Sequence, residues 1–544
     1  MNGGRQVIGH DFLVRRPFGN VVWAGSTTMS QLPTRRSFLA ASTAAAVGLI
    51  FKPAIAEPQD LTGITLQQAR QLLRSKAVSP VDLTRACLAR IERYNGKLDA
   101  FITVTREQAL ADARAMEVEQ AQGKWRGPLH GIPIALKDNI DTAGVRTTAA
   151  SALFKDRVPT EDAEVVRRLK EAGAVMLGKL NLHEFAYGGT SDVSYFGPVH
   201  NPWALDHISG GSSGGSAVAA ASELCFGTLG TDTLGSIRMP SSYCGVVGFK
   251  PTYGRVSLRG IIPLSWTLDH AGPICRTVED CALMLGTIAG YDPLDPASVD
   301  VPVPDYSRAF EMQTSSLRLG IPKSPFFDGL DAEVAAAVET AIGVLRKFTR
   351  SVADVRLPQP ADVVTIMRVE AYAYHAKWIA KSPEKYQPLT RERLLGSADL
   401  KGAPYAQALR QTSLQRREIT KVFSSIDLLV TPTMRRTAES FAESKNFDPL
   451  GPRNTSPFDA FGLPTITLPC GFSAAGLPIG LQITGAPFAE STVLTLAHAY
   501  ERETAWHARR PNLTSIWLAG QISASKADET EKLLIGNKAM ASLR

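Results

Sequence analysis

The segment at residues 210–238, GGSSGGSAVAAASELCFGTLGTDTLGSIR, constrains the fold of this chain more than any other. It is rich in glycine and serine and carries little charge. A flexible linker has a similar composition, but core-like apolar sequence flanks this segment on both sides. Glycine lets a backbone pass close to another group, and serines supply hydroxyls for chemistry. We therefore expect this segment inside a globular domain, close to a functional site.

The rest of the chain alternates between short apolar strands and helices. GIPIALKDNI (131–140) predicts a buried strand followed by a polar turn, and residues 161–181 predict a helix, a glycine and a strand. A helix is expected from Pro80, with Ser79 as its N-terminal cap. Further strands are expected at 424–433, 462–472 and 476–485, before a helix near 490–503. Strands that alternate with helices favour an α/β fold.

Three segments depart from this pattern. Residues 300–445 are richer in helical pattern and predict a helical insertion on the same core. Residues 516–544 are polar and weakly patterned, which predicts a C-terminal tail. Between a leader at 1–56 and this tail, residues 57–515 are expected to form the main domain.

The leader differs from the body in charge. It holds six Lys and Arg residues and one Asp, so the net charge of +7 is close to +2 without it, and we expect no nucleic-acid partner. Arg35 and Arg36 precede an apolar run of 14 residues from Phe38 to Phe51, and Ala54-Ile55-Ala56 forms a small-residue cleavage site. This pattern resembles a bacterial twin-arginine signal and predicts a periplasmic or secreted protein, free of the membrane after cleavage. The true start is then expected at Met29.

Metal and disulfide chemistry find little support in the sequence. Six cysteines are present, none in a CxxC pair, and apolar neighbours predict buried free thiols for most of them. The segment HEFAYGG lacks the second histidine of a zinc-binding helix. A glycine-rich phosphate loop of the G-x-x-x-x-G-K-[ST] type is missing. We therefore expect no metal and no cofactor.

A serine nucleophile needs a base, and the segment at 210–238 contains no histidine. Lys137 is the best candidate, because it follows the apolar run GIPIAL. Burial lowers the pKa of a lysine, and a neutral lysine can take a proton from serine. The alternative is a surface lysine that pairs with Asp138.

At this point the sequence resembles the amidase signature family. The match covers residues 210–257 almost throughout, and GIPIALKDNID matches the lysine segment of that family. Two flanking blocks also match, LNLHEFAYGGTSDVSYFGPVHNPW and GLPTITLPCGF with GLPIGLQITG, so the resemblance spans roughly residues 60–511. It implies a single α/β/α domain around a large mixed, mostly parallel β-sheet.

The resemblance implies a Ser–cis-Ser–Lys triad. Lys137 takes the place of the family lysine, Ser212 that of the serine after a cis peptide bond, and Ser236 that of the nucleophile, at intervals of 75 and 24 residues. In these roles Ser236 attacks an amide carbonyl, and its proton passes through Ser212 to neutral Lys137. The implied oxyanion donors are the backbone N–H groups of four residues: Thr233, Leu234, Gly235 and Ser236.

One residue departs from the family pattern. Leu234 stands where the family usually has glycine, so it is either strained at positive φ or narrows the site. Ser213 and Ala186 are further candidates for contact with the site or substrate, the latter through its backbone. Asp232 and Arg238 are interpreted as a structural ion pair.

The expected function is hydrolysis of a small-molecule amide to an acid and an amine or ammonia. Glycines 210, 211 and 214 with Ser212 also satisfy G-x-S-x-G, but NPWALDHIS before them is no buried strand, which argues against an α/β-hydrolase elbow. Two alternatives stay open: the glutaminase subunit of a tRNA-dependent amidotransferase, which the leader disfavours, and an inactive binding protein on the same scaffold. A homodimer is also left open.

Overall fold

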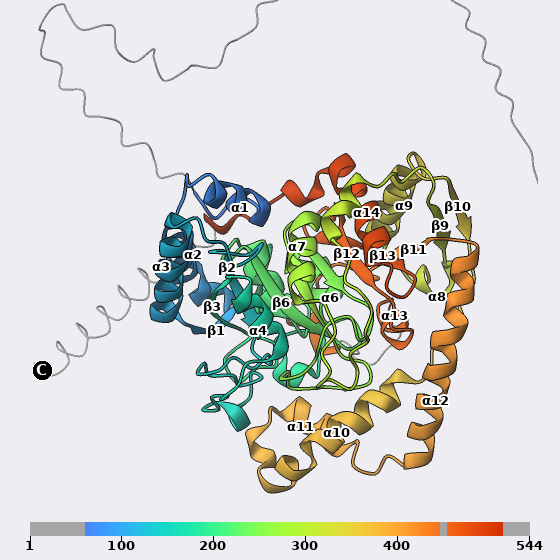
Figure 1. Cartoon of the computed structure of the whole chain (residues 1–544). Coiled ribbons are helices and arrows are strands. Elements are labelled where there is room, and N and C mark those ends of the chain that lie inside the picture. Colours follow the sequence, from blue (N-terminus) through green and yellow to red (C-terminus); the bar gives the residue numbers. More distant parts are fainter. Residues whose placement is uncertain (1–59, 447–453, 515–544) are drawn as a thin grey trace, which may run out of the picture. The chain divides into compact units, whose positions relative to one another are not determined.

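A computed structural model describes residues 60–446 and 454–514 of the chain. Its centre is a sheet of 11 strands in the order β1-β3-β2-β6-β8-β7-β12-β13-β11-β9-β10 (Figure 1). The strands are β1 Phe101–Val104, β2 Pro133–Lys137, β3 Val175–Leu180, β6 Gly227–Asp232, β7 Val247–Lys250, β8 His270–Cys275, β9 Arg318–Ile321, β10 Ser351–Asp354, β11 Leu428–Pro432, β12 Thr465–Phe472 and β13 Pro478–Gly485. A separate pair consists of β4 His200–Asn201 and β5 Ala204–Ile208.

The expected large mixed sheet is confirmed, but parallel pairs are not its majority. β2 pairs in parallel with β3 and β6, and β9 with β10 and β11, whereas the other neighbouring strands are antiparallel. Strands that follow each other closely, such as β12 and β13, can pair as hairpins and are then antiparallel. The strands at the centre are buried along their whole length, as expected when helices cover both faces.

Fourteen α-helices are assigned within the described ranges. They are α1 Leu66–Arg74, α2 Pro80–Leu98, α3 Arg106–Ala121, α4 Glu164–Glu171, α5 Gly214–Ala221, α6 Arg238–Cys244, α7 Val278–Ile288, α8 Lys323–Phe326, α9 Ala332–Arg346, α10 Val363–Lys381, α11 Pro388–Leu395, α12 Gly402–Glu418, α13 Ser456–Ala460 and α14 Glu490–Thr504. No helix in the described part of the chain is long and apolar enough to cross a bilayer.

Local sequence signals explain several of these elements. α2 begins at Pro80, as expected, because Ser79 Oγ accepts a hydrogen bond from Asp82 N at 3.1 Å and the Asp82 carboxylate accepts one from Ser79 N. α4 and β3 confirm the helix and strand expected at 161–181, and β11, β12, β13 and α14 confirm those expected toward the C-terminus. All six cysteines lie in the described residues as buried free thiols.

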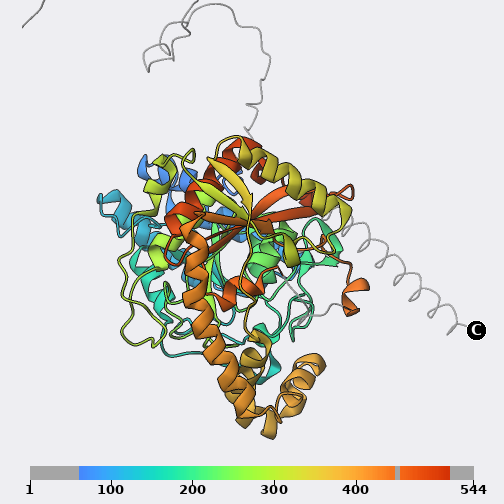
Figure 2. The ribbon, with the colours of Figure 1, turned by 90° about the vertical axis from the view of Figure 1, so that its right-hand side faces the viewer.

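The stretch at 300–445 contributes both strands and helices. β9 and β10 extend the main sheet at one end, while α10 and α11 project from the body below the sheet, and α12 runs from them back along the side of the body (Figures 1 and 2). α10 packs on α11 and on α12. Apolar residues of α10, among them Val363, Ile366 and Met367, join one cluster with Leu234 of the serine-rich segment. The projecting helices therefore cover one side of the region that contains the candidate site.

Candidate active site

Lys137 is the last residue of β2 and lies at the end of a fully buried strand. Its Nζ is 2.7 Å from Ser212 Oγ, 2.7 Å from Thr231 Oγ1 and 3.5 Å from the carbonyl oxygen of Thr231. A neutral amine has two N–H groups and one lone pair. Both N–H groups can point to Thr231, which leaves the lone pair directed at the hydroxyl of Ser212.

The surroundings of Lys137 favour the uncharged amine. Its side chain has no exposed surface, and within residues 60–446 and 454–514 it forms no salt bridge. Burial lowers the pKa of Lys137 to about 7, against the opposing charges of Asp269 and Asp232. A substantial share of Lys137 is therefore neutral near pH 7 and able to accept a proton.

Ser212 stands at the start of the turn that leads into α5. The Gly211–Ser212 peptide bond is cis, which confirms the geometry implied for this position. A side chain on Gly211 would meet Ser191 Oγ at 2.7 Å, so only glycine fits there without a shift. The carbonyl of Ser212 accepts hydrogen bonds from His183 N at 3.1 Å and Ser191 Oγ at 3.2 Å. The backbone of Ser212 is thus fixed while its hydroxyl faces Lys137.

Ser213 joins the two halves of the serine-rich segment. Its backbone N–H donates to the carbonyl oxygen of Ser236 at 3.2 Å. Its hydroxyl donates to the carbonyl oxygen of Thr231 at 3.0 Å and accepts from Thr231 N at 3.2 Å. Ser213 therefore brings the loop of Ser236 next to the turn of Ser212 and serves as a structural link.

Ser236 lies in the tight turn between β6 and α6, and 6% of its surface is exposed. The carboxylate of Asp232 accepts hydrogen bonds from Gly235 N at 2.5 Å and Ile237 N at 3.1 Å, so it holds both sides of the serine. Arg238 forms the expected ion pair with Asp232 at 3.0 Å and a second with Asp459 at 2.5 Å. Burial alone would raise the pKa of Asp232, but Arg238 outweighs it and holds this pKa well below its usual range.

Leu234 and Gly235 differ in the backbone conformation that they adopt in this turn. Gly235 has φ +133°, and a side chain on it would strike Thr455 Oγ1 at 2.3 Å. Leu234 is not among the residues at positive φ, so leucine causes no backbone strain at this position. Its side chain is buried in an apolar cluster. Of the two expectations for Leu234, the structure therefore leaves the one in which its side chain fills space beside the site.

Ala186 follows Phe185 in a short 3-10 turn, and both have positive φ, 59° and 52°. Ala186 is buried in the same apolar cluster as Leu234, and Phe185 N donates to the carbonyl of Ala149 at 2.9 Å. Two non-glycine residues in the left-handed region cost conformational free energy, which the surrounding packing must offset. The structure places Ala186 near Leu234 through this shared cluster.

Three residues of this region were not found from the sequence. Thr231 orients Lys137. The sequence signal for it was the alternation of side chains between the two faces of β6, because Thr231 lies two residues before the candidate Thr233. Asp269 accepts a hydrogen bond from Thr233 Oγ1 at 2.6 Å, and Thr455 Oγ1 donates to the carbonyl of Leu234 at 2.6 Å. Both contacts join segments that are far apart in the chain, so no local sequence pattern predicts them.

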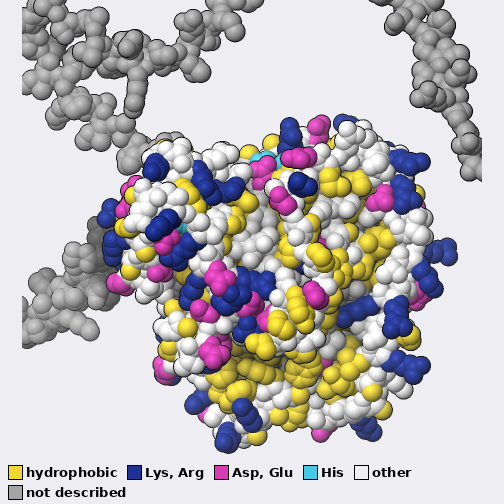
Figure 3. All heavy atoms as spheres, viewed as in Figure 1, with side chains coloured by type: hydrophobic (Ala, Val, Ile, Leu, Met, Phe, Trp, Pro, Cys, Tyr) yellow, Lys and Arg dark blue, Asp and Glu magenta, His cyan; other side chains and the backbone are white. Residues whose placement is uncertain are grey.

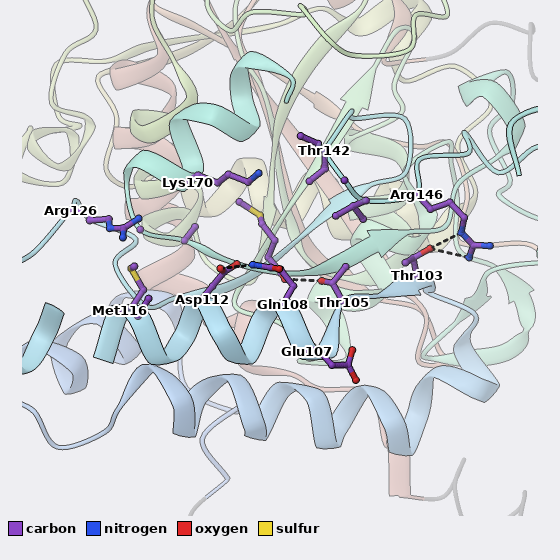
Figure 4. A pocket seen from close by; sticks show the side chains of 17 residues that line it. Thr103, Thr105, Glu107, Gln108, Asp112, Met116, Arg126, Thr142, Arg146 and Lys170 are labelled. Atoms are coloured by element: carbon purple, nitrogen blue, oxygen red, sulfur yellow. Dashed lines mark hydrogen bonds between the residues drawn. The ribbon is translucent and has the colours of Figure 1, made fainter. Parts of the chain in front are cut away.

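Among the cavities that the described residues line, two of the larger ones lie outside this cluster. One, of about 730 Å³, lies between α3, β3 and the 142–146 loop, and its polar wall includes Thr103, Gln108, Asp112 and Lys170 (Figure 4). Another, of about 450 Å³, has mainly apolar walls and is lined by Asp269. Neither contains Lys137, Ser212 or Ser236. Figure 3 shows hydrophobic side chains gathered around α10 and α11 on the face it displays.

The fold and the site together define a class of hydrolase. A buried lysine, a serine after a cis peptide bond and a second serine in a tight turn are residues from which acyl transfer can draw a base, a relay and a nucleophile. A family model described as Amidase matches residues 82–494, and the chain belongs to this family. It is an enzyme that hydrolyses C–N amide bonds.

Curated relatives align with nearly the whole described chain. The A subunit of glutamyl-tRNA(Gln) amidotransferase from Moorella thermoacetica is 44% identical over 485 residues, which cover 84% of this chain and 99% of the relative. The protein of the same name from Geobacter metallireducens is 41% identical over 486 residues, with 84% and 100% covered.

Solved structures give the same picture. The A subunit of glutamyl-tRNA(Gln) amidotransferase from Thermotoga maritima superposes with a TM-score of 0.71 at 32% identity, over 84% of this chain and 98% of that one. Native peptide amidase from Stenotrophomonas maltophilia gives 0.73 at 32% identity, over 82% and 98%. Similar folds thus serve both an amidotransferase component and a peptide amidase.

These relatives overturn the expected periplasmic or secreted location. They are subunits of an enzyme that acts on glutamyl-tRNA, and tRNA is charged inside the cell. The prediction rested on Arg35, Arg36 and a 14-residue apolar run, a short local pattern that the alignment over 485 residues outweighs. Residues 1–56 and the predicted tail at 516–544 lie outside the described residues.

Proposed function

We propose that the chain hydrolyses the side-chain amide of glutamine and acts as the glutaminase component of an amidotransferase, beside at least one other protein. The curated relatives support this choice of substrate and partner, because those named above carry the name of an amidotransferase component. The main observation is the contact between the buried amine of Lys137 and Ser212 Oγ at 2.7 Å. Together with the burial that lowers the pKa of Lys137 to about 7, this contact supports Lys137 as the base.

In the proposed reaction Ser236 Oγ attacks the amide carbonyl carbon. The proton of Ser236 moves to Ser212, whose own proton moves to Lys137. The backbone N–H groups of Thr233, Leu234 and Ser236 stabilise the negative oxygen of the tetrahedral intermediate, whereas the N–H of Gly235 already donates to the Asp232 carboxylate. This intermediate then expels ammonia, which takes a proton back through Ser212, and leaves an ester on Ser236. Water hydrolyses the ester to glutamate along the same proton route.

The fixed backbone around the two serines supports this sequence of steps. Asp232 holds the N–H groups that flank Ser236, and Ser213 N holds the carbonyl of Ser236. A turn whose donors are fixed before the substrate binds needs little reorganisation as the negative charge develops. The loss of one such donor typically lowers the rate by about 10²–10³.

Purified protein can be tested for glutamate release from glutamine, alone and with the cell's other amidotransferase components. We expect glutamine turnover that increases when a partner binds, stable co-purification with that partner, and no turnover by Ser236→Ala. A fluorophosphonate probe should label the wild type and not Ser236→Ala. Absence of labelling at Ser236 would instead support the inactive scaffold.

A second candidate is an amidase that works alone on a more apolar amide. It is favoured by Leu234, which stands where the family usually has glycine and packs in an apolar cluster with α10. A panel of amides separates the two candidates. Efficient turnover of aryl or alkyl amides without any partner, together with none of glutamine, would favour the amidase.

A further inference from the structure

A carboxylate outside the triad connects the turn of Ser236 to the charge of Lys137. Asp269 lies just before β8 and is almost fully buried. It accepts three hydrogen bonds: from Thr233 Oγ1 at 2.6 Å, from Leu264 N at 2.9 Å and from Ser265 N at 3.1 Å. All three groups are donors, so the ionised carboxylate satisfies each of them.

Asp269 anchors the first residue of the turn that carries the oxyanion donors. Thr233 is buried, and its hydroxyl contacts Asp269 on the neighbouring strand segment. Thr455 fixes the next residue by donating to the carbonyl of Leu234 at 2.6 Å. The turn is therefore held at its start by Asp269 and at its middle by Thr455. Displacement of catalytic groups by about 1 Å can cost about 10²-fold in rate.

The same carboxylate acts on Lys137 through its charge. Asp269 is the strongest of the charges that oppose the effect of burial on the pKa of Lys137, and Asp232 is the other. Burial raises the pKa of Asp269 to about 7, although its hydrogen bonds from Thr233, Ser265 and Leu264 act in the opposite direction. The charge of Asp269 also interacts with two further titratable groups, Glu370 of α10 and Tyr253.

Asp269 also lines the cavity of about 450 Å³, together with Tyr253 and Trp266. The cavity holds a second carboxylate, Asp295, whose two oxygens accept from Leu258 N at 2.7 Å and Ala297 N at 2.9 Å. Asp295 therefore binds loop backbone as Asp269 does, but its hydrogen bonds do not reach the Ser236 turn. It offers a matched control.

We propose that Asp269 is a positioning residue of the hydrolase: its carboxylate fixes Thr233 of the oxyanion turn, and its charge acts on the buried amine of Lys137. This inference rests on the proposed roles of Ser236 and Lys137. Ionised Asp269, the form that prevails above its pKa of about 7, stabilises protonated Lys137, so more alkaline conditions are needed to free the amine. In return, the same charge stabilises the lysinium that forms when Lys137 takes the proton of Ser212.

The test measures the rate at which a fluorophosphonate labels Ser236 in the full chain, across about pH 5 to 9. Three variants are compared with the wild type: Asp269→Asn, Thr233→Val and Asp295→Asn. Asp269→Asn should be labelled about 10- to 100-fold more slowly at high pH. The acid limb of its pH profile, that is, the range in which the labelling rate rises with pH, should move to lower pH by about half a unit to one unit. Thr233→Val should slow labelling without moving the limb, since Asp269 keeps its charge. Asp295→Asn should match the wild type.

The outcomes separate this inference from the proposed function. A wild type that is not labelled at Ser236 refutes the proposed function itself. If the wild type is labelled, and Asp269→Asn shows the same labelling rate and the same acid limb, then only the proposed role of Asp269 is refuted. A purely structural role would slow labelling but leave the limb in place, and that result also contradicts the proposal. If Asp269→Asn does not fold, Thr233→Val decides, because an unchanged labelling rate excludes the anchoring of the turn.

Discussion

Two lysines on neighbouring strands share nearly every physical property except their partners. Lys137 ends β2 and Lys179 lies on β3, and the register pairs Leu136 with Lys179 and Lys137 with Leu180. Since successive side chains point to opposite faces of a sheet, the two lysines project to opposite sides. Both are buried. Burial lowers the pKa of Lys137 to about 7 and that of Lys179 to about 8.

The groups that surround the two amines differ in what they can do with a proton. Lys179 Nζ donates to the carbonyl of Ile140, to Thr147 Oγ1 at 2.8 Å and to Thr142 Oγ1 at 3.4 Å. These contacts hold the loop that follows β2. Lys137 instead contacts Ser212, whose turn is joined through Ser213 to the loop of Ser236, the proposed nucleophile. A shifted pKa therefore indicates burial, and the partners decide whether the amine supports a loop or accepts protons.

The largest expected difference is between the two methionine variants. Lys137→Met removes the proposed base and should lower amide hydrolysis by about 10⁴-fold. Lys179→Met should retain most activity, but the free energy of unfolding should fall by about 1–3 kcal/mol because the buried oxygens of Ile140 and Thr147 lose their donor. Initial rates and urea denaturation measure the two effects. Equal loss of activity in both variants would contradict the difference in role between Lys137 and Lys179.

The partner hydroxyls give a second matched pair. Ser212→Ala removes the relay 2.7 Å from Lys137 and should reduce the rate by about 10²–10⁴. Thr147→Ala removes the hydroxyl 2.8 Å from Lys179 and should leave the rate near that of the wild type, with about 1 kcal/mol less stability. The same assays apply. A Ser212→Ala enzyme with normal turnover would show that Lys137 does not act through Ser212.

Local patterns in the sequence identify Lys137 as a candidate base, but they do not show how its surroundings differ from those of Lys179. The apolar run before Lys137 marks a strand end, and that strand is β2. Lys179 lies within a similar apolar run, and nothing in that run shows which face of the sheet it occupies. The face depends on the register between β2 and β3, which are separated along the chain by α4. The sequence therefore supports a buried base at 137 and says little about its counterpart.

Long-range contacts set the limit for the rest of the site. Ser212 and Ser236 lie in one segment, so a motif can predict both. Asp269 and Thr455 reach the turn of Ser236 from 36 and 221 residues away, counted from Thr233 and Leu234. Such contacts depend on strand order rather than on local pattern. The 11-stranded order, in which β6 lies between β2 and β8, brings Asp269 to this turn.

The pH dependence sharpens the comparison further. The proposed mechanism needs neutral Lys137, so kcat/KM should rise with pH through about 7 and then level off. Below this range the amine is protonated and has no lone pair for the proton of Ser212. Lys179→Met should show the same acid limb, because Lys179 faces the other side of the sheet. A limb that moves in Lys179→Met would mean that both lysines titrate with the reaction.

The smallest expected effect on activity concerns Asp138, which follows Lys137 in the chain but serves the other lysine. Its carboxylate accepts from Thr148 N at 2.9 Å, and its charge opposes the effect of burial on the pKa of Lys179. Asp138→Asn should therefore lower the pKa of Lys179 further and reduce the melting temperature, while kcat/KM and its acid limb stay close to those of the wild type. The readouts are thermal unfolding and the pH profile. A rate loss as large as that of Ser212→Ala would instead place Asp138 with the proton relay, and adjacency in sequence would then matter more than the face of the sheet.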